Sequence, residues 1–237
     1  MLGSAIFSMM MLNANEVDRL VQSRGTLIFE DHFERNEKDD SKEDLGKKWV
    51  TNSAKRAKGD KQADLNEGRL EITMSDKADH GVSVRHDAPF DDGVIKARFM
   101  MNDSKGIGFN FNDPKCKESH AGHICHLGVK PTGIDFRDGK TGTFSLAAMK
   151  IKKSGGSKSE LKKLLKGKSK VEKMKLEKGK WYDVAIVIEG PKMTAYLDGK
   201  EISSFSSEGI DHPVKQNLAF SVSGKASVDD LQIYKLK

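Results

Sequence analysis

The chain lacks the sequence signatures of several large enzyme classes. It contains no Gly-x-Ser-x-Gly nucleophile elbow, no phosphate-binding loop and no glycine-rich dinucleotide fingerprint. The single Gly-Lys-Ser, at 167–169, lacks the upstream glycine of a phosphate-binding loop. No apolar run reaches the roughly 20 residues that a membrane-spanning helix needs. These absences argue against nucleotide-dependent chemistry, serine-hydrolase chemistry and a membrane span.

Arginine is absent from the most basic part of the chain. The net charge of the protein is +6, but residues 150–180 hold thirteen lysines and three glutamates, a local balance of +10. Nucleic-acid sites usually combine cations with stacking aromatic residues, and this segment has no aromatic residue. We interpret it as a solvated, lysine-rich insertion, and we expect no nucleic-acid partner.

Cysteine is scarce, since Cys116 and Cys125 are the only two. A pair nine residues apart in an exported chain favours a disulfide that closes a small loop. Two alternatives stay open: a pair of free thiols, and a zinc site formed together with His120 and His123. The spacing matches no zinc signature, so the disulfide is the preferred interpretation.

The beginning of the sequence resembles part of an export signal. Residues 1–14 form an apolar run of signal-core length that ends at a small residue, Ala14, although no Lys or Arg precedes it. We predict a weak signal-like segment and linker over residues 1–25. An extracytoplasmic location, periplasmic or secreted, follows from this interpretation.

Most of the remaining chain shows the pattern of short antiparallel strands. Residues 106–112 place Ile107, Phe109 and Phe111 on one face, the period of a half-buried strand. Such segments follow one another closely, with glycine-rich turns between them. This pattern predicts an all-β sandwich rather than βαβ units.

One segment interrupts the strand pattern. Residues 159–165 carry a leucine stripe behind a serine, which predicts a short helix with Ser159 as its N-cap. The helix lies in the lysine-rich insertion, which we place at 152–180. The predicted organisation is therefore one sandwich domain over 26–237 with one helical insertion.

Three segments of the C-terminal third resemble a known family. Trp181 leads the strand WYDV, the next strand ends in AYLDGK at Lys200, and VDDLQIY closes the chain at 228–234. These segments resemble concanavalin A-like sandwich domains. More narrowly, residues 27–236 resemble the 3-keto-disaccharide hydrolase domain family, which is related in fold to family 16 glycoside hydrolases. The resemblance implies an antiparallel concanavalin A-like jelly roll and a carbohydrate ligand.

One departure from the related hydrolases limits the mechanism. Family 16 enzymes carry a Glu-x-Asp-x-Glu strand motif, and retaining hydrolysis needs two carboxylates about 5 Å apart. No such motif occurs in this chain. Glycoside cleavage by that carboxylate pair is therefore not expected.

Histidines concentrate in one segment, which makes it the leading candidate for a reactive site. His120 and His123 flank Ala-Gly, and histidine exchanges protons near neutral pH. Strand alternation predicts that His123 and Cys125 share a face while His126 points the other way. We predict that one of His120 and His123 is a general base and the other an orienting group. The alternative is a loop stabilised by histidine hydrogen bonds.

Two further segments complete the predicted site. Asp138, in a glycine-rich turn, would orient a histidine, and His212, held extended by the next proline, would add a third. The catalytic candidates are therefore His120, His123, Asp138 and His212. The substrate-binding candidates are Asn110, Lys140 and Lys215. A plain hairpin turn at Asp138 and a surface loop at His212 remain alternatives, and His32, His80 and His86 are expected to be merely exposed.

Two acidic positions suggest a structural cation. In related sandwiches a calcium ion joins the first and last strands, and Asp31 and Asp229 hold those positions here. Calcium takes several oxygen ligands, which include backbone carbonyls. Asp31 and Asp229 are therefore the candidate ligands of a calcium cofactor.

Three functions are compatible with the sequence. The first is a glycoside hydrolase or lyase that uses histidine and aspartate; a 3-keto group acidifies the C2 proton of a sugar, so one base can start elimination at C1. The second is a non-catalytic glycan-binding sandwich, for which stacking aromatics such as Trp49 and Trp181 are scarce. The third is a structural or interaction module. The enzyme is preferred, while the sugar and the oligomeric state stay open.

Overall fold

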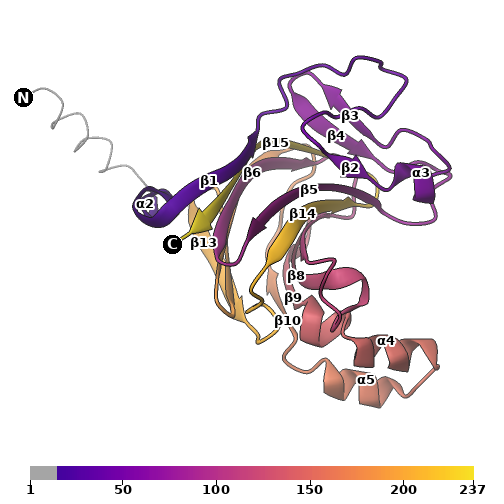
Figure 1. Cartoon of the computed structure of the whole chain (residues 1–237), viewed down its shortest axis with the longest axis vertical. Coiled ribbons are helices and arrows are strands. Elements are labelled where there is room, and N and C mark those ends of the chain that lie inside the picture. The colour runs from indigo at the N-terminus through magenta and orange to yellow at the C-terminus, as the bar shows by residue number, and fades with distance from the viewer. Residues whose placement is uncertain (1–14) are drawn as a thin grey trace, which may run out of the picture.

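Two antiparallel sheets pack face to face in the computed structural model, which describes residues 15–237 (Figure 1). One sheet has the order β13-β12-β11-β6-β15-β4-β3, with β1 also paired to β15. The other has the order β10-β9-β8-β7-β14-β5-β2. The predicted antiparallel jelly-roll sandwich is confirmed. The signal-like segment predicted at 1–14 lies outside the described residues.

The strands are short and follow one another closely in the chain. The first sheet contains β1 (Gly25–Asp31), β3 (Ala63–Asn66), β4 (Arg69–Thr73), β6 (Gly93–Met101), β11 (Trp181–Glu189), β12 (Lys192–Leu197), β13 (Lys200–Ser206) and β15 (Lys225–Leu236). The second contains β2 (Val50–Thr51), β5 (Val82–Phe90), β7 (Ile107–Asn112), β8 (His123–Lys130), β9 (Gly133–Asp138), β10 (Ser169–Lys173) and β14 (Lys215–Val222).

The helices lie outside the two sheets. They are α2 (Glu16–Arg24), α3 (Ser53–Arg56), α4 (Leu146–Lys153) and α5 (Lys158–Leu164), with shorter helical turns at His120–Gly122 and Gly139–Thr143. Helix α2 packs near the chain's C-terminal end (Figure 1), where Val17 is buried in a cluster with Val94 and Leu236. Among the described residues, no helix has the length and apolar character needed to cross a bilayer.

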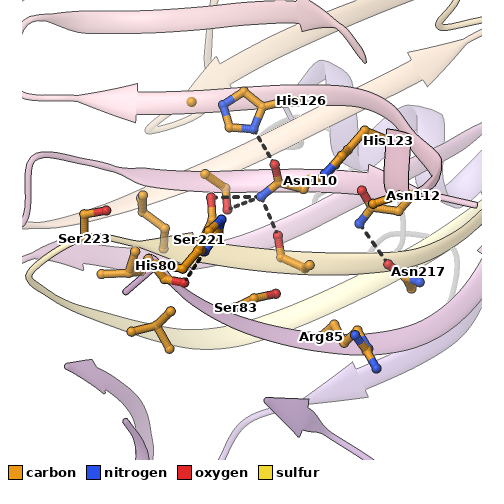
Figure 2. Close-up of a pocket in the computed structure, with 18 of the residues that line it drawn as sticks. His80, Ser83, Arg85, Asn110, Asn112, His123, His126, Asn217, Ser221 and Ser223 are labelled. Atoms are coloured by element: carbon orange, nitrogen blue, oxygen red, sulfur yellow. Dashed lines mark hydrogen bonds between the residues drawn. The ribbon is translucent and has the colours of Figure 1, made fainter. Parts of the chain in front are cut away.

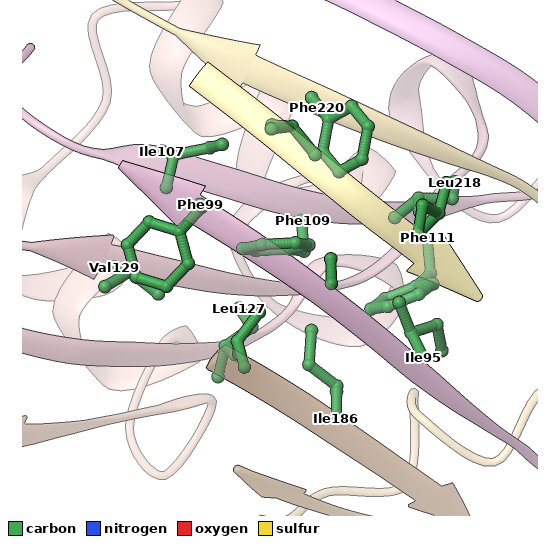
Figure 3. Packing of buried hydrophobic residues seen from close by; sticks show 14 of the residues in the cluster. Ile95, Phe99, Ile107, Phe109, Phe111, Leu127, Val129, Ile186, Leu218 and Phe220 are labelled. Atoms are coloured by element: carbon green, nitrogen blue, oxygen red, sulfur yellow. The ribbon is translucent and has the colours of Figure 1, made fainter. Parts of the chain in front are cut away.

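The core lies between the two sheets and is built by strand alternation. Ile107, Phe109 and Phe111 are buried on one face of β7, as predicted from their spacing. The Phe109 ring meets Phe99 of the opposite sheet and Phe220 of β14 edge-on, with centroids 6.2 and 5.6 Å away (Figure 3). This alternation sends the remaining side chains of the seven-stranded sheet to its outer face.

The lysine-rich segment contains more secondary structure than the single helix predicted for it. The predicted helix is found as α5, but Ser157 rather than Ser159 is its N-cap. A second helix, α4, precedes it and is capped by Ser145. The following strand β10 pairs with β9, so part of the range 152–180 extends a sheet edge. Figure 1 shows α4 and α5 projecting beyond the β8–β10 end of the sandwich.

The predicted disulfide is wrong, because both cysteines are free thiols. Cys125 lies on β8 with its side chain in the core between the sheets, and Cys116 is buried nearby in the same hydrophobic cluster. Burial raises the pKa of the Cys125 thiol to about 12, so the thiol stays protonated. A zinc site is not supported either, since the described residues contain no cluster of three or more ligating side chains.

The geometry of Asp31 does not fit the predicted calcium site. Its side chain is fully buried and accepts hydrogen bonds from Arg35 Nη1 at 2.6 Å, from Trp49 Nε1 at 2.8 Å and from the Phe33 amide at 3.0 Å. Burial alone would raise the pKa of Asp31, but these hydrogen bonds outweigh it and hold the pKa below its usual value. Asp229 instead lies 3.9 Å from Arg98. Calcium needs free oxygen ligands, and those of Asp31 already face a guanidinium and an indole.

Asp31 therefore acts as a buried anchor between the first strand and the loop that follows it. We expect Asp31→Ala to lower the free energy of unfolding by about 3–5 kcal/mol, because the variant leaves the Arg35 guanidinium without its buried partner. Denaturant titration measures the change. The matched control is Arg24→Ala, which breaks the exposed Arg24–Glu189 pair and should cost less than about 1 kcal/mol. A melting temperature that falls on addition of a calcium chelator would contradict this assignment.

Candidate functional site

The outer face of the seven-stranded sheet forms a long open groove of about 1440 Å³. Pockets for single small molecules usually occupy roughly 300–1,000 Å³, so the groove suits an extended ligand. Its floor is polar because the apolar residues of the same strands face the core. On β14, for example, Leu218 and Phe220 are buried in the core while Asn217 and Ser221 line the groove.

The most organised group in the groove is His126 on β8 with Asn110 on β7 (Figure 2). The Asn110 side-chain amide nitrogen donates to the Ala219 carbonyl at 3.0 Å and to Ser221 Oγ at 2.9 Å. Its Oδ1 therefore faces His126 Nδ1, 2.7 Å away. An amide oxygen only accepts hydrogen bonds, so Nδ1 carries the proton and Nε2 keeps a free lone pair. The network thus fixes the tautomer of His126.

Two glycines make room for the His126 ring. A Cβ at Gly108 would lie 2.6 Å from His126 Cε1, and a Cβ at Gly128 would lie 2.8 Å from its Nε2. Any larger residue at either position would push the ring out of its place. The imidazole therefore lies low against the sheet, where one side of the ring is packed and Nε2 is left without a protein partner among residues 15–237.

His123 and His126 are both neutral at physiological pH. Burial lowers the pKa of each imidazole to about 4. The His123 ring stacks on Phe144, with centroids 4.1 Å apart. Both groups can therefore accept a proton or a hydrogen bond across the whole neutral range.

A second amide pair extends the floor. Asn112 Nδ2 donates to Asn217 Oδ1 at 3.0 Å (Figure 2), while the buried Asn112 Oδ1 has no hydrogen-bond partner within the described chain. Buried polar atoms are normally paired, and Asn112 Oδ1, enclosed beneath the groove surface, is an exception to this rule. Sequence reasoning missed Asn112 and Asn217, although both follow from the alternation of β7 and β14.

Three predicted residues do lie in the groove: Asn110, His120 and His123. The expectation that His126 points away from them is wrong. Asn112 pairs with His123 but Phe111 pairs with Cys125, so β8 contains one extra residue at this point. This bulge shifts the alternation, and His123 and His126 come to line the same groove while Cys125 turns into the core.

Asp138 does not orient a histidine. It is fully buried and accepts hydrogen bonds from the Thr141 amide at 2.8 Å, from Ser207 Oγ at 2.6 Å and from the Gly209 amide at 3.1 Å. A Cβ at Gly209 would lie 2.1 Å from its Oδ1. Asp138 therefore joins the 139–143 turn to the 207–209 loop, which agrees with the alternative interpretation as a turn residue.

His212, Lys140 and Lys215 also lie outside the groove. His212 Nε2 contacts Asp113 Oδ2 at 3.1 Å, and the buried Lys215 Nζ donates to the Asp91 and His212 carbonyls at 2.7 and 3.0 Å. Burial lowers the pKa of Lys215. Lys140 pairs with Glu118 at 3.3 Å. These side chains stabilise loops, and none is available to a ligand in the groove.

Two histidines that were expected to be merely exposed line the groove: His80 is exposed as predicted, whereas His86 is not. His80 lies at the groove edge (Figure 2). His86 is buried, with its ring stacked on Phe29 at 3.6 Å between centroids. Burial lowers the pKa of His86 as well. Because charged residues surround both histidines in the sequence, His86 was predicted to be exposed, and its packing against Phe29 was missed.

The groove contains no carboxylate pair. Asp87 is the one carboxylate in its lining among the described residues. Hydrolysis through two carboxylates needs two such groups on opposite sides of the bond, and the described lining supplies one. The groups able to move protons in the groove are histidines, and His126 is the best positioned.

These features define a jelly-roll sandwich with a polar, histidine-containing groove on one sheet. Solved structures of the same fold include an endo-β-1,3-glucanase from Pyrococcus furiosus, with 16% identity over 90% of this chain and 95% of that chain, at a TM-score of 0.51. A non-specific endo-β-1,3(4)-glucanase of family GH16 shares 12% identity over 91% of this chain and 92% of that chain, at 0.56. At such identities the likeness shows the fold alone.

A sialidase shares the fold over a smaller part of its length. The two chains are 12% identical over 73% of this chain, at a TM-score of 0.52, and this chain spans 16% of the sialidase. No family model and no curated protein sequence matches the chain.

The lowered histidine pKa values predict a loss of stability in mild acid. Above pH 6.5 the two histidines are neutral in the folded and unfolded chain alike. Between pH 6.5 and about 4 the unfolded chain binds protons that the folded chain excludes, so the free energy of unfolding falls as the pH drops. Denaturant titrations from pH 7.5 to 4.5 should show less loss in His126→Gln than in the wild type, by on the order of 1–3 kcal/mol. Parallel curves for the two proteins would show that burial of His126 carries no such cost.

Proposed function

We propose that the groove binds a glycan and that His126 Nε2 is the general base for cleavage of a glycoside next to a carbonyl group. The observation that carries this proposal is the fixed tautomer of His126, whose free lone pair lies on the floor of an open groove. Hydroxyl-rich ligands match the hydroxyl groups of the groove lining, such as Ser83 and Ser221. The shared fold of the two glucanases agrees with a carbohydrate ligand.

A 3-keto glycoside is the substrate that best suits a single base. His126 Nε2 takes the C2 proton, the C–H electron pair forms the C1–C2 double bond, and the C1–O bond breaks. The leaving alkoxide recovers a proton from the histidinium, and addition of water at C1 completes hydrolysis. This series of steps needs no second carboxylate.

We also infer an extracytoplasmic location, since the apolar run at 1–14 is of signal-core length.

A non-catalytic glycan-binding module is the second candidate. A pKa of about 4 makes His126 a weak base, and general bases work best when their pKa lies near the operating pH. In that case the imidazole would serve only as a hydrogen-bond acceptor for a sugar hydroxyl. The two functions share the groove and differ only in turnover.

Substitution of His126 separates the two functions. With 3-keto glycosides as substrates, we expect His126→Gln to lower kcat/KM at least about 100-fold while the melting temperature changes little, because the general base is lost. The control is His32→Gln, which removes an exposed histidine that contacts Asp230 far from the groove. Undiminished turnover in His126→Gln would exclude this residue as the base. Groove-dependent glycan binding without turnover on any substrate would favour the binding module.

Asn110 is proposed as a positioning residue, and its test is a pH profile. In Asn110→Asp a carboxylate faces His126 Nδ1 and favours the imidazolium. The acid limb of kcat/KM, expected near pH 4 in the wild type, should therefore move upward by about 1–2 pH units. Asn110→Ala should instead lower the rate without this shift. An acid limb that stays in place in Asn110→Asp would contradict the proposed hydrogen bond.

A further inference from the structure

We infer that the ligand of the groove is an acidic glycan, one that carries carboxylate or sulfate groups along its chain. This inference rests on the proposed function only in taking the ligand to be a glycan. It is carried by the distribution of charge in the groove.

Cations greatly outnumber carboxylates in the lining. The cations are Lys48, Arg85, Lys105, Lys130 and Arg137, against Asp87 alone. Lys130 and Arg137 share the buried Asp135, from which Lys130 Nζ is 3.3 Å away. In contrast, Lys48, Arg85 and Lys105 are exposed and form no ion pair with any described carboxylate. Such uncompensated cations in a hollow produce a positive potential that concentrates anions.

Basic side chains lie on both sides of the floor, but Arg137 is already paired with Asp135, so among the described residues Arg85 is the free cation on the β5 side. Arg137 is on β9 and Arg85 is on β5, whereas β8, β7 and β14 between them supply histidine, asparagine and serine. At about 4.8 Å per strand, the four strand steps from β9 to β5 span about 19 Å. An oligosaccharide that crosses the strands would place its hydroxyls on the polar floor and its charged substituents near Arg85 and Lys48.

The polar floor favours a glycan over a nucleic acid. Phe144 is the one Phe, Tyr or Trp in the lining among the described residues, and its ring already stacks on His123. Single-stranded nucleic acids bind through aromatic platforms for their bases, and neutral sugars often stack on aromatic rings as well. With both kinds of stacking missing, ion pairs and hydrogen bonds must supply the affinity. His126 Nε2 in the groove lining accepts hydrogen bonds, which sugar hydroxyls can donate.

Matched polymers that differ only in charge test the inference. Affinity electrophoresis would compare dextran sulfate with dextran, and polygalacturonate with its methyl ester, using single-stranded DNA as a polyanion without sugar hydroxyls on each unit. We expect at least tenfold tighter binding of the acidic polymer in each pair, weakening as salt rises. The double variant Arg85→Gln/Lys105→Gln should lose about two- to fivefold in affinity per charge removed.

Two controls each remove one positive charge elsewhere. Arg98→Gln removes a cation on the outer face of the other sheet, beside Trp181, and Lys162→Gln removes an exposed cation of α5. Both should bind the acidic glycans as the wild type does. Loss of binding in Lys162→Gln but not in the groove variant would overturn the assignment to the groove.

The remaining outcomes are decisive as well. Equal affinity for the charged and neutral member of each pair would overturn the acidic class while leaving a glycan-binding groove in place. Tighter binding of DNA than of any acidic glycan, or no binding of any acidic glycan, would overturn the inference outright. Turnover of 3-keto glycosides is measured in a separate assay, so failure of the proposed activity is distinguishable from failure of the charge preference.

Discussion

The groove depends on one constraint: the inner strands of the seven-stranded sheet must bury one face against the other sheet. Phe109, Phe111, Leu218 and Phe220 fill the core from β7 and β14, and their neighbours in sequence are thereby fixed on the opposite side. A β-strand alternates with a period of two, so the register of the core sets the register of the groove. The amides and hydroxyls of the site are held in place by packing on the far side of the same strands.

The placement of the histidines in the groove depends on departures from that regularity. The extra residue in β8 brings His123 and His126 to the same side, and the small residues Gly108 and Gly128 let the imidazole of His126 lie against the sheet. Burial then keeps the ring neutral, while Asn110 decides which nitrogen holds the proton. The bulge, the two glycines and the hydrogen bond from Nδ1 together determine the position and the free lone pair of His126 Nε2.

The sequence was sufficient for the strands and their buried faces, because alternation such as that of Ile107, Phe109 and Phe111 records burial directly. It was insufficient for the site. The bulge in β8 cannot be recognised from the residue types, so His126 was predicted to lie on the wrong face of the strand. Asp138, His212 and Lys215 are polar residues in loops, and no local pattern reveals that their partners are Ser207, Asp113 and two backbone carbonyls. Charge surrounding His86 suggested exposure, whereas a distant residue, Phe29, stacks on its ring.

The burial of the two cysteines has a consequence for where the protein can operate. A thiol attacks a disulfide only as the thiolate, and the Cys125 thiol, enclosed between the sheets, remains protonated at any physiological pH. Cys116 is enclosed in the same cluster. In the folded chain neither of these two sulfurs is exposed to a thiol-exchange partner, whether the compartment is oxidising or reducing.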